Sequence, residues 1–334
     1  MFKKIYTDQL VEILTKTIEE PFLLKKISLC QTQASAKKYF DLLLQDKKGY
    51  VKAKVWDLNM DDRYLTFEDH IVLIKGQVIL NSKEEIELLV NALSPLSDYD
   101  IADYINGLTQ KDTDGYVALL FKYIQKVKHE GYSDILNRFF SANMESFKAV
   151  PASLKHFNNY NGGLLVRTIC TTCLAYNMRN SLNTYNYDPR FKNHFNDDLL
   201  ISSSLLHSIG TVDLLLPFPE AKKISSSVLL SVYELTVIRL SKIISENKIS
   251  ISQEDFNLLI HCIHTIYNDD LKPMVREAVL LRSAYQLQTS ISRMDYFIHV
   301  NKKAQGSVYD EKLKNYVYIS KREESTHGKD ISGK

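Results

Sequence analysis

The hydrophobic pattern of this chain changes near residue 95, and this change constrains the fold more than any other feature of the sequence. Between residues 20 and 95, apolar residues occur in short or alternating runs separated by turn sequences, as in β-strands. From residue 96 to about residue 300 they recur at i, i+3 and i+4, as in amphipathic helices. A chain of 334 residues is long enough for two domains. We therefore expect an α+β multidomain protein, with strands first and helices second.

Five strands are predicted in the first third of the chain, over residues 22–30, 37–45, 49–58, 70–80 and 85–93. The sequence Asp46-Lys-Lys-Gly49 is a tight-turn signal between the second and third strands. Residues 59–69 leave room for a short helix after the third. This order is that of an OB-fold, a five-stranded β-barrel that often binds oligonucleotides. We assign residues 20–95 to such a nucleic-acid-binding domain and residues 1–19 to a helical lead-in.

Alternation along the third predicted strand gives it an apolar and a polar side. The polar side carries Lys52, Lys54 and Trp56, the only tryptophan of the chain. Tyr39 on the neighbouring strand can lie on the same side. Stacking of bases on aromatic rings, with lysines neutralising phosphates, holds single strands without sequence readout. The spacing fits equally well a barrel in which Trp56 closes one end and the lysines are merely solvated.

Helical periodicity continues through the rest of the chain, over residues 115–127, 132–150, 162–178, 198–216, 226–244, 252–267 and 276–300. We divide this part into a helical connector (96–150), a helical domain (151–319) and a tail (320–334). The tail has few apolar residues and is expected to be disordered. The apolar stretch from Ser225 to Ile244 is compatible with assembly into a homo-oligomer.

The composition of the chain says more about where the protein is located than about what it does. The chain has 42 basic and 40 acidic residues, a balance too even to indicate nucleic acid by itself. No apolar run reaches the roughly 18 residues of a membrane span, so no membrane association is expected. The four cysteines suggest no disulfide framework, and a reducing, cytoplasmic location follows. Cys170 and Cys173 form a C-x-x-C pair inside a helical pattern, which favours core packing over a zinc site.

Five segments, in order, carry a resemblance: residues 40–57, 71–78, 151–168, 205–212 and 277–294. Together they resemble the YhaM-type 3'-5' exoribonucleases of low-GC Gram-positive bacteria, with similar spacing from about residue 10 to residue 318. The resemblance implies an OB-fold followed by an HD-type phosphohydrolase domain. In such a domain, His and Asp side chains hold one or two divalent metals that activate a water against the phosphodiester.

The resemblance implies a set of metal-ligand positions, and at most of them this chain carries a different residue. In chain order, they and their neighbours are now Phe157, Asn158, Arg167, His207, Ser208, Tyr267, Arg282, Tyr285 and Gln288. Only His207 is a retained ligand, and His156 is displaced by one position from the lost His-His pair. Ser208 brings no charge to offset a metal, and Arg167 places a permanent cation where a metal would lie. We therefore predict a degenerate HD site with no catalytic residue, metal or cofactor.

Two other interpretations of this site remain open. His261 and His264 share a helix face and, with His207 and Asp213, could rebuild a site for Mn or Mg. Alternatively, the new arginines could bind phosphate without metal, or the replaced residues could simply fill the space and satisfy one another.

Three functions follow from the sequence. The first is a non-catalytic protein that binds single-stranded DNA or RNA, as an accessory factor in replication, plasmid or mobile-element maintenance, or RNA metabolism. The second is a metal-dependent 3'-5' exonuclease with a rearranged site. The third is a scaffold for protein partners or for a homo-oligomer.

Overall fold

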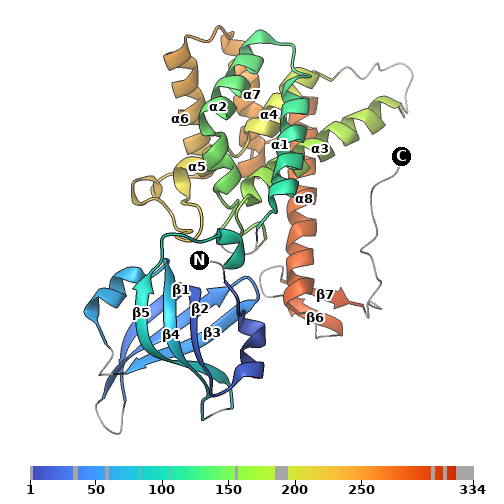
Figure 1. Ribbon diagram of the computed structural model, residues 1–334. Coiled ribbons are helices and arrows are strands. Elements are labelled where there is room, and N and C mark those ends of the chain that lie inside the picture. Colours follow the sequence, from blue (N-terminus) through green and yellow to red (C-terminus); the bar gives the residue numbers. More distant parts are fainter. Residues whose placement is uncertain are drawn as a thin grey trace.

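The two parts expected from the hydrophobic pattern are present in a computed structural model of the protein (Figure 1). The structure describes residues 3–32, 37–56, 60–82, 84–105, 107–154, 157–184, 195–301, 305–310 and 314–320. A β-barrel comes first, and a helical region packs against one end of it. The C-terminal half of the last long helix runs beside the barrel (Figure 1).

The barrel has five strands: β1 (Thr17–Gln31), β2 (Lys38–Asp46), β3 (Gly49–Trp56), β4 (Ile71–Leu80) and β5 (Ile86–Pro95). They close in the order β1-β2-β3-β5-β4, antiparallel except for β3 and β5. A short 3-10 helix, η3 (Asp62–Phe67), follows β3. This arrangement confirms the predicted OB-fold. Alternate residues such as Phe40, Leu42 and Val55 fill the interior because successive side chains of a strand point to opposite faces.

The N-terminal boundary of the barrel differs from the prediction. The lead-in is a 3-10 helix, η1 (Thr7–Ile13), and β1 already begins at Thr17, because residues 17–23 pair with β4. Ahead of η1, Lys3 is buried, donates to the carbonyl oxygen of Pro21 at 2.7 Å and lies 3.5 Å from the carboxylate of Asp46. Burial lowers the pKa of Lys3 to about 8, although the charge of Asp46 acts in the opposite direction. The lead-in is thus packed onto the barrel.

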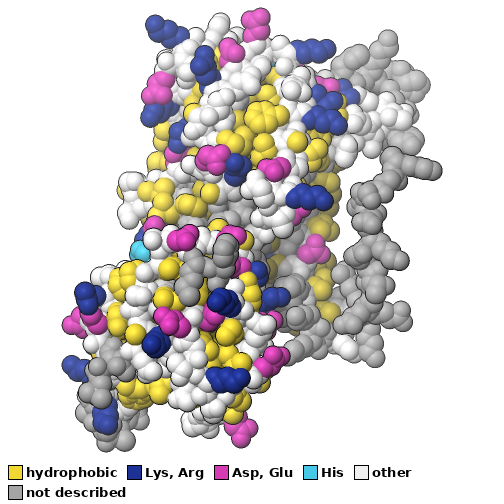
Figure 2. All heavy atoms as spheres, viewed as in Figure 1, with side chains coloured by type: hydrophobic (Ala, Val, Ile, Leu, Met, Phe, Trp, Pro, Cys, Tyr) yellow, Lys and Arg dark blue, Asp and Glu magenta, His cyan; other side chains and the backbone are white. Residues whose placement is uncertain are grey.

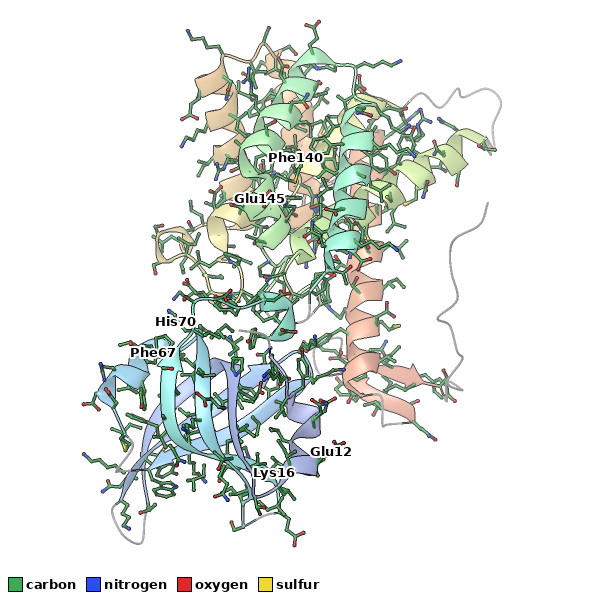
Figure 3. All side chains as sticks on the ribbon, in the orientation of Figure 1. Glu12, Lys16, Phe67, His70, Phe140 and Glu145 are labelled. Atoms are coloured by element: carbon green, nitrogen blue, oxygen red, sulfur yellow. The ribbon has the colours of Figure 1, made fainter. Side chains whose placement is uncertain are left out.

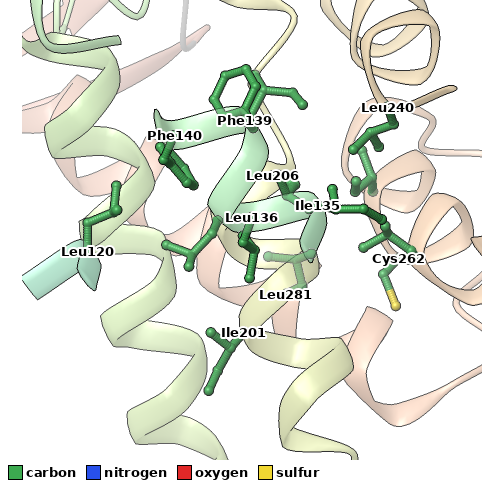
Figure 4. Close-up of a cluster of buried hydrophobic side chains, with 14 of the residues drawn as sticks. Leu120, Ile135, Leu136, Phe139, Phe140, Ile201, Leu206, Leu240, Cys262 and Leu281 are labelled. Carbon is green, nitrogen blue, oxygen red and sulfur yellow. The ribbon is translucent and has the colours of Figure 1, made fainter. Parts of the chain in front are cut away.

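The helical region contains η4 (Ile101–Asp103), α1 (Gln110–Ile124), α2 (Glu130–Ala149), α3 (Gly163–Thr184), α4 (Asp197–Leu206), α5 (Thr211–Leu214), η5 (Ser225–Ser227), α6 (Val232–Asn247), α7 (Gln253–Tyr267) and α8 (Arg276–Val300). One apolar core joins them, and in it Leu136, Phe140 and Leu206 are fully buried (Figure 4). Within the described part of the chain, no helix is both long and apolar enough to cross a bilayer.

Three details of the helical prediction are wrong. The helix expected over 198–216 is broken between α4 and α5, because Gly210 lies against the backbone of α6: a Cβ there would come within 2.5 Å of the nitrogen of Thr236. The helix expected over 226–244 begins only at Val232. The domain expected to be all-helical ends in a hairpin of β6 (Gly306–Asp310) and β7 (Asn315–Ile319). Residues 321–334, most of the predicted tail, lie outside the described residues.

A small apolar cluster joins the barrel to the helical region. Leu23 and Ile71 of the barrel pack with Tyr104 and Ile105 of the connector, and all four are buried. Phe218, from the segment between α5 and η5, lies against the same cluster. His70, at the start of β4, marks this end of the barrel in Figure 3. The junction is therefore a packed contact, and side chains from both parts can line one site.

Candidate nucleic-acid interface and the HD-type pocket

The outer face of the β2–β3 ladder is the surface that the sequence singled out. Four outward pairs follow one another along it: Tyr39 with Trp56, Asp41 with Lys54, Leu43 with Lys52, and Gln45 with Tyr50. The residues between them on both strands are buried. The last pair lies six positions along the strand from the first, which at about 3.3 Å per residue gives a track of roughly 20 Å. We call this track the ladder face.

The two aromatic residues expected at one end of the ladder face are in contact. The ring centroids of Tyr39 and Trp56 are 4.8 Å apart, with a tilt of 36° between the planes. Both side chains are partly exposed rather than buried in the barrel. Trp56 is not among the hydrophobic residues that pack against the barrel core. The pair offers a flat apolar surface of the kind on which bases stack.

The two lysines of the ladder face are each held by a carboxylate from the region of β5. Lys54 lies 3.0 Å from Glu87, and Lys52 lies 3.3 Å from Glu85. Burial acts to lower the pKa of Lys54, but the hydrogen bond and charge of Glu87 outweigh it and raise the pKa. The Nζ of Lys54 also lies 5.8 Å from the ring centroid of Tyr39. These lysines are therefore paired cations, which weakens their attraction for phosphate.

His207, the residue that the resemblance suggests is a retained metal ligand, lies at the C-terminal end of α4 and is fully buried. Its Nδ1 is 2.7 Å from the carbonyl oxygen of Ser204, and this contact makes Nδ1 the donor. Its Nε2 has no hydrogen-bond partner among the described residues. The pKa of His207 is lowered to about 4, mainly by burial and in part by the positive charge of Arg167, while the hydrogen bond to Ser204 acts in the opposite direction. The imidazole is therefore neutral at physiological pH.

Aromatic residues pack around His207. The ring of Tyr285 from α8 meets the His207 ring edge-on at 5.4 Å, and Tyr267 from α7 lies 6.2 Å from Tyr285. The hydroxyl of Tyr267 donates to the carbonyl oxygen of His207 and is 2.8 Å from the hydroxyl of Ser208. Three of the replaced residues thus contact one another around the retained histidine.

Arg167 reaches the same pocket from α3 and is almost fully buried. Its guanidinium donates to the carbonyl oxygen of Ala152 at 3.0 Å and lies 5.3 Å from the ring centroid of Phe157. Asn158 is buried and accepts through its carbonyl oxygen from the backbone of Ala152. Phe157 and Asn158 therefore help to fix Arg167. His156, the displaced histidine, lies outside the described residues.

Two predicted pocket residues are engaged elsewhere. Arg282 donates to the carbonyl oxygen of Leu271 and to the carboxylate of Asp269, at 2.9 Å each, so it holds the segment after α7. Gln288 is buried, and its amide donates to Ser292 one turn along α8. The structure therefore assembles Phe157, Arg167, His207, Ser208, Tyr267 and Tyr285, and gives Arg282 a different partner.

The histidines considered for a rebuilt metal site are likewise occupied. Nε2 of His261 accepts from the backbone nitrogen of Met274 at 2.9 Å, and His264 stacks on Tyr233 at 4.3 Å. Asp213 forms an ion pair with Arg239. Over the ranges that the structure describes, no group of three or more His, Cys, Asp or Glu side chains is placed to hold a metal ion. The described residues around His207 do not fit a divalent metal, because their only charged member is cationic.

A further pocket was missed in the sequence. It lies at the junction of the barrel and the helical region, has a volume of about 350 Å³, and is lined by Lys25, Gln45, Tyr50, Ile105, Leu154, Asn159, Phe218, Ala221 and Tyr296. These residues come from segments separated by up to 271 positions, so no local motif indicates the site. Gln45 and Tyr50 are also the last pair of the ladder face.

Positive and negative side chains are interspersed on the surface shown in Figure 2, over the barrel and the helical region alike. This agrees with the near-neutral composition. Electrostatics alone therefore do not identify a binding face on that side, and aromatic content and shape must do so.

Comparison with known proteins gives relatives in sequence along most of the chain. No family model matches. The chain is 25% identical over 285 residues to the 3'-5' exoribonuclease YhaM of Listeria innocua, a match that covers 83% of this chain and 86% of the relative. The enzyme of the same name from Oceanobacillus iheyensis is 22% identical over 78% of this chain and 80% of its own length.

Solved structures match the barrel weakly. The second OB-fold domain of replication protein A from Methanococcus maripaludis is 15% identical and covers 29% of this chain and 97% of that domain, with a TM-score of 0.20. A replication protein A heterotrimer bound to single-stranded DNA is 18% identical and covers 30% of this chain and 27% of that chain, with a TM-score of 0.21. With TM-scores this low, these matches carry no argument, and the OB-fold assignment rests on the strand order of the barrel. The sequence matches extend further: over 78 to 83% of its length, the chain is similar to the 3'-5' exoribonucleases named YhaM, at 22 to 25% identity.

Proposed function

We propose that this protein binds single-stranded nucleic acid, RNA or DNA, along the ladder face, and that its helical domain does not hydrolyse the strand through an HD metal centre. The observation that carries the binding proposal is the pair of Tyr39 and Trp56, two partly exposed rings in contact at one end of an outward-facing track. Because every base has a flat face, such a platform holds a strand without selecting its sequence. The name of the relatives, exoribonuclease, favours RNA as the strand.

The loss of hydrolysis is supported by what fills the HD-type pocket. A buried guanidinium, that of Arg167, acts on the retained His207. A divalent metal beside it would meet a permanent positive charge in a poorly solvated site, and no carboxylate of the described residues acts on His207 to offset either cation. The hydroxyls of Ser208 and Tyr267 are hydrogen-bonded to each other. Polar and aromatic side chains thus occupy the space around His207, and among the described residues Nε2 of His207 and Nε of Arg167 have no hydrogen-bond partner.

One observation favours the alternative of a working nuclease. His207 is neutral and its Nε2 has no partner among the described residues, which is the protonation state that a metal ligand requires. A single imidazole holds a catalytic metal only with further ligands. Hydrolysis is therefore one of the outcomes of the experiment that closes the Discussion.

Removal of the aromatic platform tests the binding proposal. We expect Trp56→Ala to weaken binding of a fluorescein-labelled 12-nucleotide single strand by about tenfold, since a stacked base contributes roughly 1–3 kcal/mol. Trp56→Phe keeps an aromatic face and should lose much less. Fluorescence anisotropy with RNA and DNA of one sequence measures both affinities. Tyr318→Ala removes an exposed tyrosine of the β6–β7 hairpin and is the matched control. Equal affinity of wild type and Trp56→Ala would refute the proposal.

A further inference from the structure

The ladder face leads directly into the junction pocket. Its last pair, Gln45 and Tyr50, lines that pocket together with Tyr296 of α8 and Asn159 of the segment before α3. A strand lying on Tyr39 and Trp56 and following the ladder face for roughly 20 Å would therefore arrive at the pocket. The barrel and the helical region both contribute to it, and neither forms it alone.

The lining of the pocket combines aromatic, amide and cationic groups. Tyr50 and Tyr296 are large rings that remain 62% and 43% exposed. Phe218 adds an apolar surface from the α5–η5 segment. The volume of about 350 Å³ lies at the lower end of the range for small-molecule sites, about 300–1,000 Å³. It suits a single nucleoside-sized group rather than a helix or a folded peptide.

Asn159 supplies a hydrogen-bonding edge. Its Nδ2 donates to the carbonyl oxygen of Leu154 at 3.0 Å, which fixes the orientation of the amide. Its buried Oδ1 accepts no hydrogen bond from any described residue. A buried acceptor without a donor is costly, and most such groups in proteins have a partner.

Lys25 is directed to the pocket by an irregularity in β1. The register of β1 against β2 shifts between Leu24 and Lys26, so Lys25 is the extra residue of a β-bulge. Bulges commonly redirect a side chain next to a functional site. The Lys25 ammonium lies 2.6 Å from Asp69 and is a quarter exposed. Lys25 is the positively charged residue of the pocket lining.

We infer that the junction pocket receives one unstacked nucleobase of the bound strand, between the rings of Tyr50 and Tyr296. This inference rests on the proposed binding of single strands and extends it from the barrel to the helical region. It assigns a role to the helical domain that needs no metal: it completes a second base site about 20 Å from the first.

The test uses 12-nucleotide oligouridylates that carry one 2-aminopurine, a fluorescent adenine analogue, at a different position in each oligonucleotide. Full-length wild type should change the 2-aminopurine emission at least twofold at one position. The double variant Tyr50→Ala/Tyr296→Ala should abolish that change and weaken binding about tenfold. Tyr50→Phe/Tyr296→Phe keeps both rings and should keep the signal. Tyr318→Ala is the control for loss of an exposed tyrosine.

Trp56, the only tryptophan, reports on the ladder face separately in the same samples. If the strand quenches Trp56 but no 2-aminopurine signal depends on the two tyrosines, the pocket inference is wrong and the ladder proposal stands. If the tyrosine-dependent signal is present without Trp56 quenching, the pocket inference stands and the ladder proposal fails. Absence of both signals refutes both. Because Tyr50 and Tyr296 are well exposed, their substitution should leave the fold intact, which circular dichroism verifies.

Discussion

The buried imidazole of His207 makes the stability of the helical region depend on pH. Its pKa is lowered from 6.5 to about 4 in the folded protein, so between these values the unfolded chain binds a proton that the folded chain does not. Stability is therefore complete above pH 6.5 and falls as pH decreases toward 4. At pH 4.5 this residue should cost about 2–3 kcal/mol relative to pH 7.

Substitution of His207 should remove that part of the acid sensitivity. His207→Gln keeps a hydrogen-bond donor but has no proton to bind, so its free energy of unfolding should change less between pH 7 and pH 4.5. Urea titrations followed by circular dichroism at 222 nm measure the difference. The same substitution at His70, an exposed histidine of the barrel, is the control. An equal pH dependence in wild type and His207→Gln would contradict this account.

The pairing of Lys54 with Glu87 should limit the electrostatic part of strand binding. Glu87→Gln keeps the shape of a buried side chain and releases the charge of Lys54. We expect affinity to rise about two- to fivefold at low salt, and the plot of log K against log salt to steepen by about 0.7, the value for one added phosphate contact on a single strand. Titrations at KCl concentrations from about 20 to about 200 mM test this prediction. An unchanged slope would mean that Lys54 does not face the strand.

At the scale of elements, the start of α3 depends on a close approach of two backbones. Gly162 has a φ of +86°, which favours glycine, and a Cβ on Gly163 would come within 2.1 Å of the carbonyl oxygen of Asn158. Asn158 accepts there from the backbone of Ala152, so the segment that holds Arg167 packs directly on Gly163. This contact explains the Gly-Gly pair of the sequence.

Gly163→Ala should therefore destabilise the helical region by about 1–3 kcal/mol, as overpacking generally does. Gly115→Ala is the matched control: it lies in the interior of α1 with open space around it and should stabilise by about 0.5–1 kcal/mol. Thermal unfolding followed by circular dichroism compares the two variants. Equal midpoints would show that the segment before α3 is not fixed by this contact.

The elements show what the sequence could and could not predict. Alternation in β3 placed Lys52, Lys54 and Trp56 on one face correctly, because side-chain direction in a strand is a local property. The partner of Lys54 was not predictable, because Glu87 reaches it only through the parallel pairing of β3 with β5, 33 residues away. The β6–β7 hairpin was missed because two five-residue strands contain too few alternations to form a signal.

The residues around His207 likewise include some that the sequence could predict and some that it could not. Of the positions that the resemblance identified, Tyr285 and Tyr267 contact His207, and Ser208 is hydrogen-bonded to Tyr267. Arg282 could not be placed from its position alone, because its partner lies in an irregular segment after α7. The junction pocket depends wholly on how the two domains pack, and periodicity within each domain contains no information about that contact.

At the scale of the whole molecule, Tyr104 connects the barrel and the helical region. It is fully buried in the junction cluster, and its hydroxyl has no hydrogen-bond partner among the residues described. Tyr104→Phe should therefore be neutral or stabilising by about 1 kcal/mol, because it removes an unsatisfied buried hydroxyl.

Tyr104→Ala, in contrast, should cost about 3 kcal/mol or more and loosen the junction. Trp56 fluorescence reports unfolding of the barrel, and circular dichroism at 222 nm reports the helices. In the wild type we expect the two transitions to coincide, and in Tyr104→Ala to separate. Coincident transitions in Tyr104→Ala would show that this cluster does not couple the two domains. Separated domains should also lose the 2-aminopurine signal of the junction pocket.

The central claim is that the protein binds a single strand without hydrolysing it. One sample observed in two ways tests both parts of this claim most directly. Purified protein is titrated into a single-stranded RNA labelled at its 5' end, with and without Mn²⁺, while Trp56 fluorescence is recorded, and the RNA is then separated on a denaturing gel. We expect Trp56 quenching and an RNA of unchanged length in both conditions. Stepwise shortening from the 3' end that requires Mn²⁺ and is lost in His207→Ala would contradict the account.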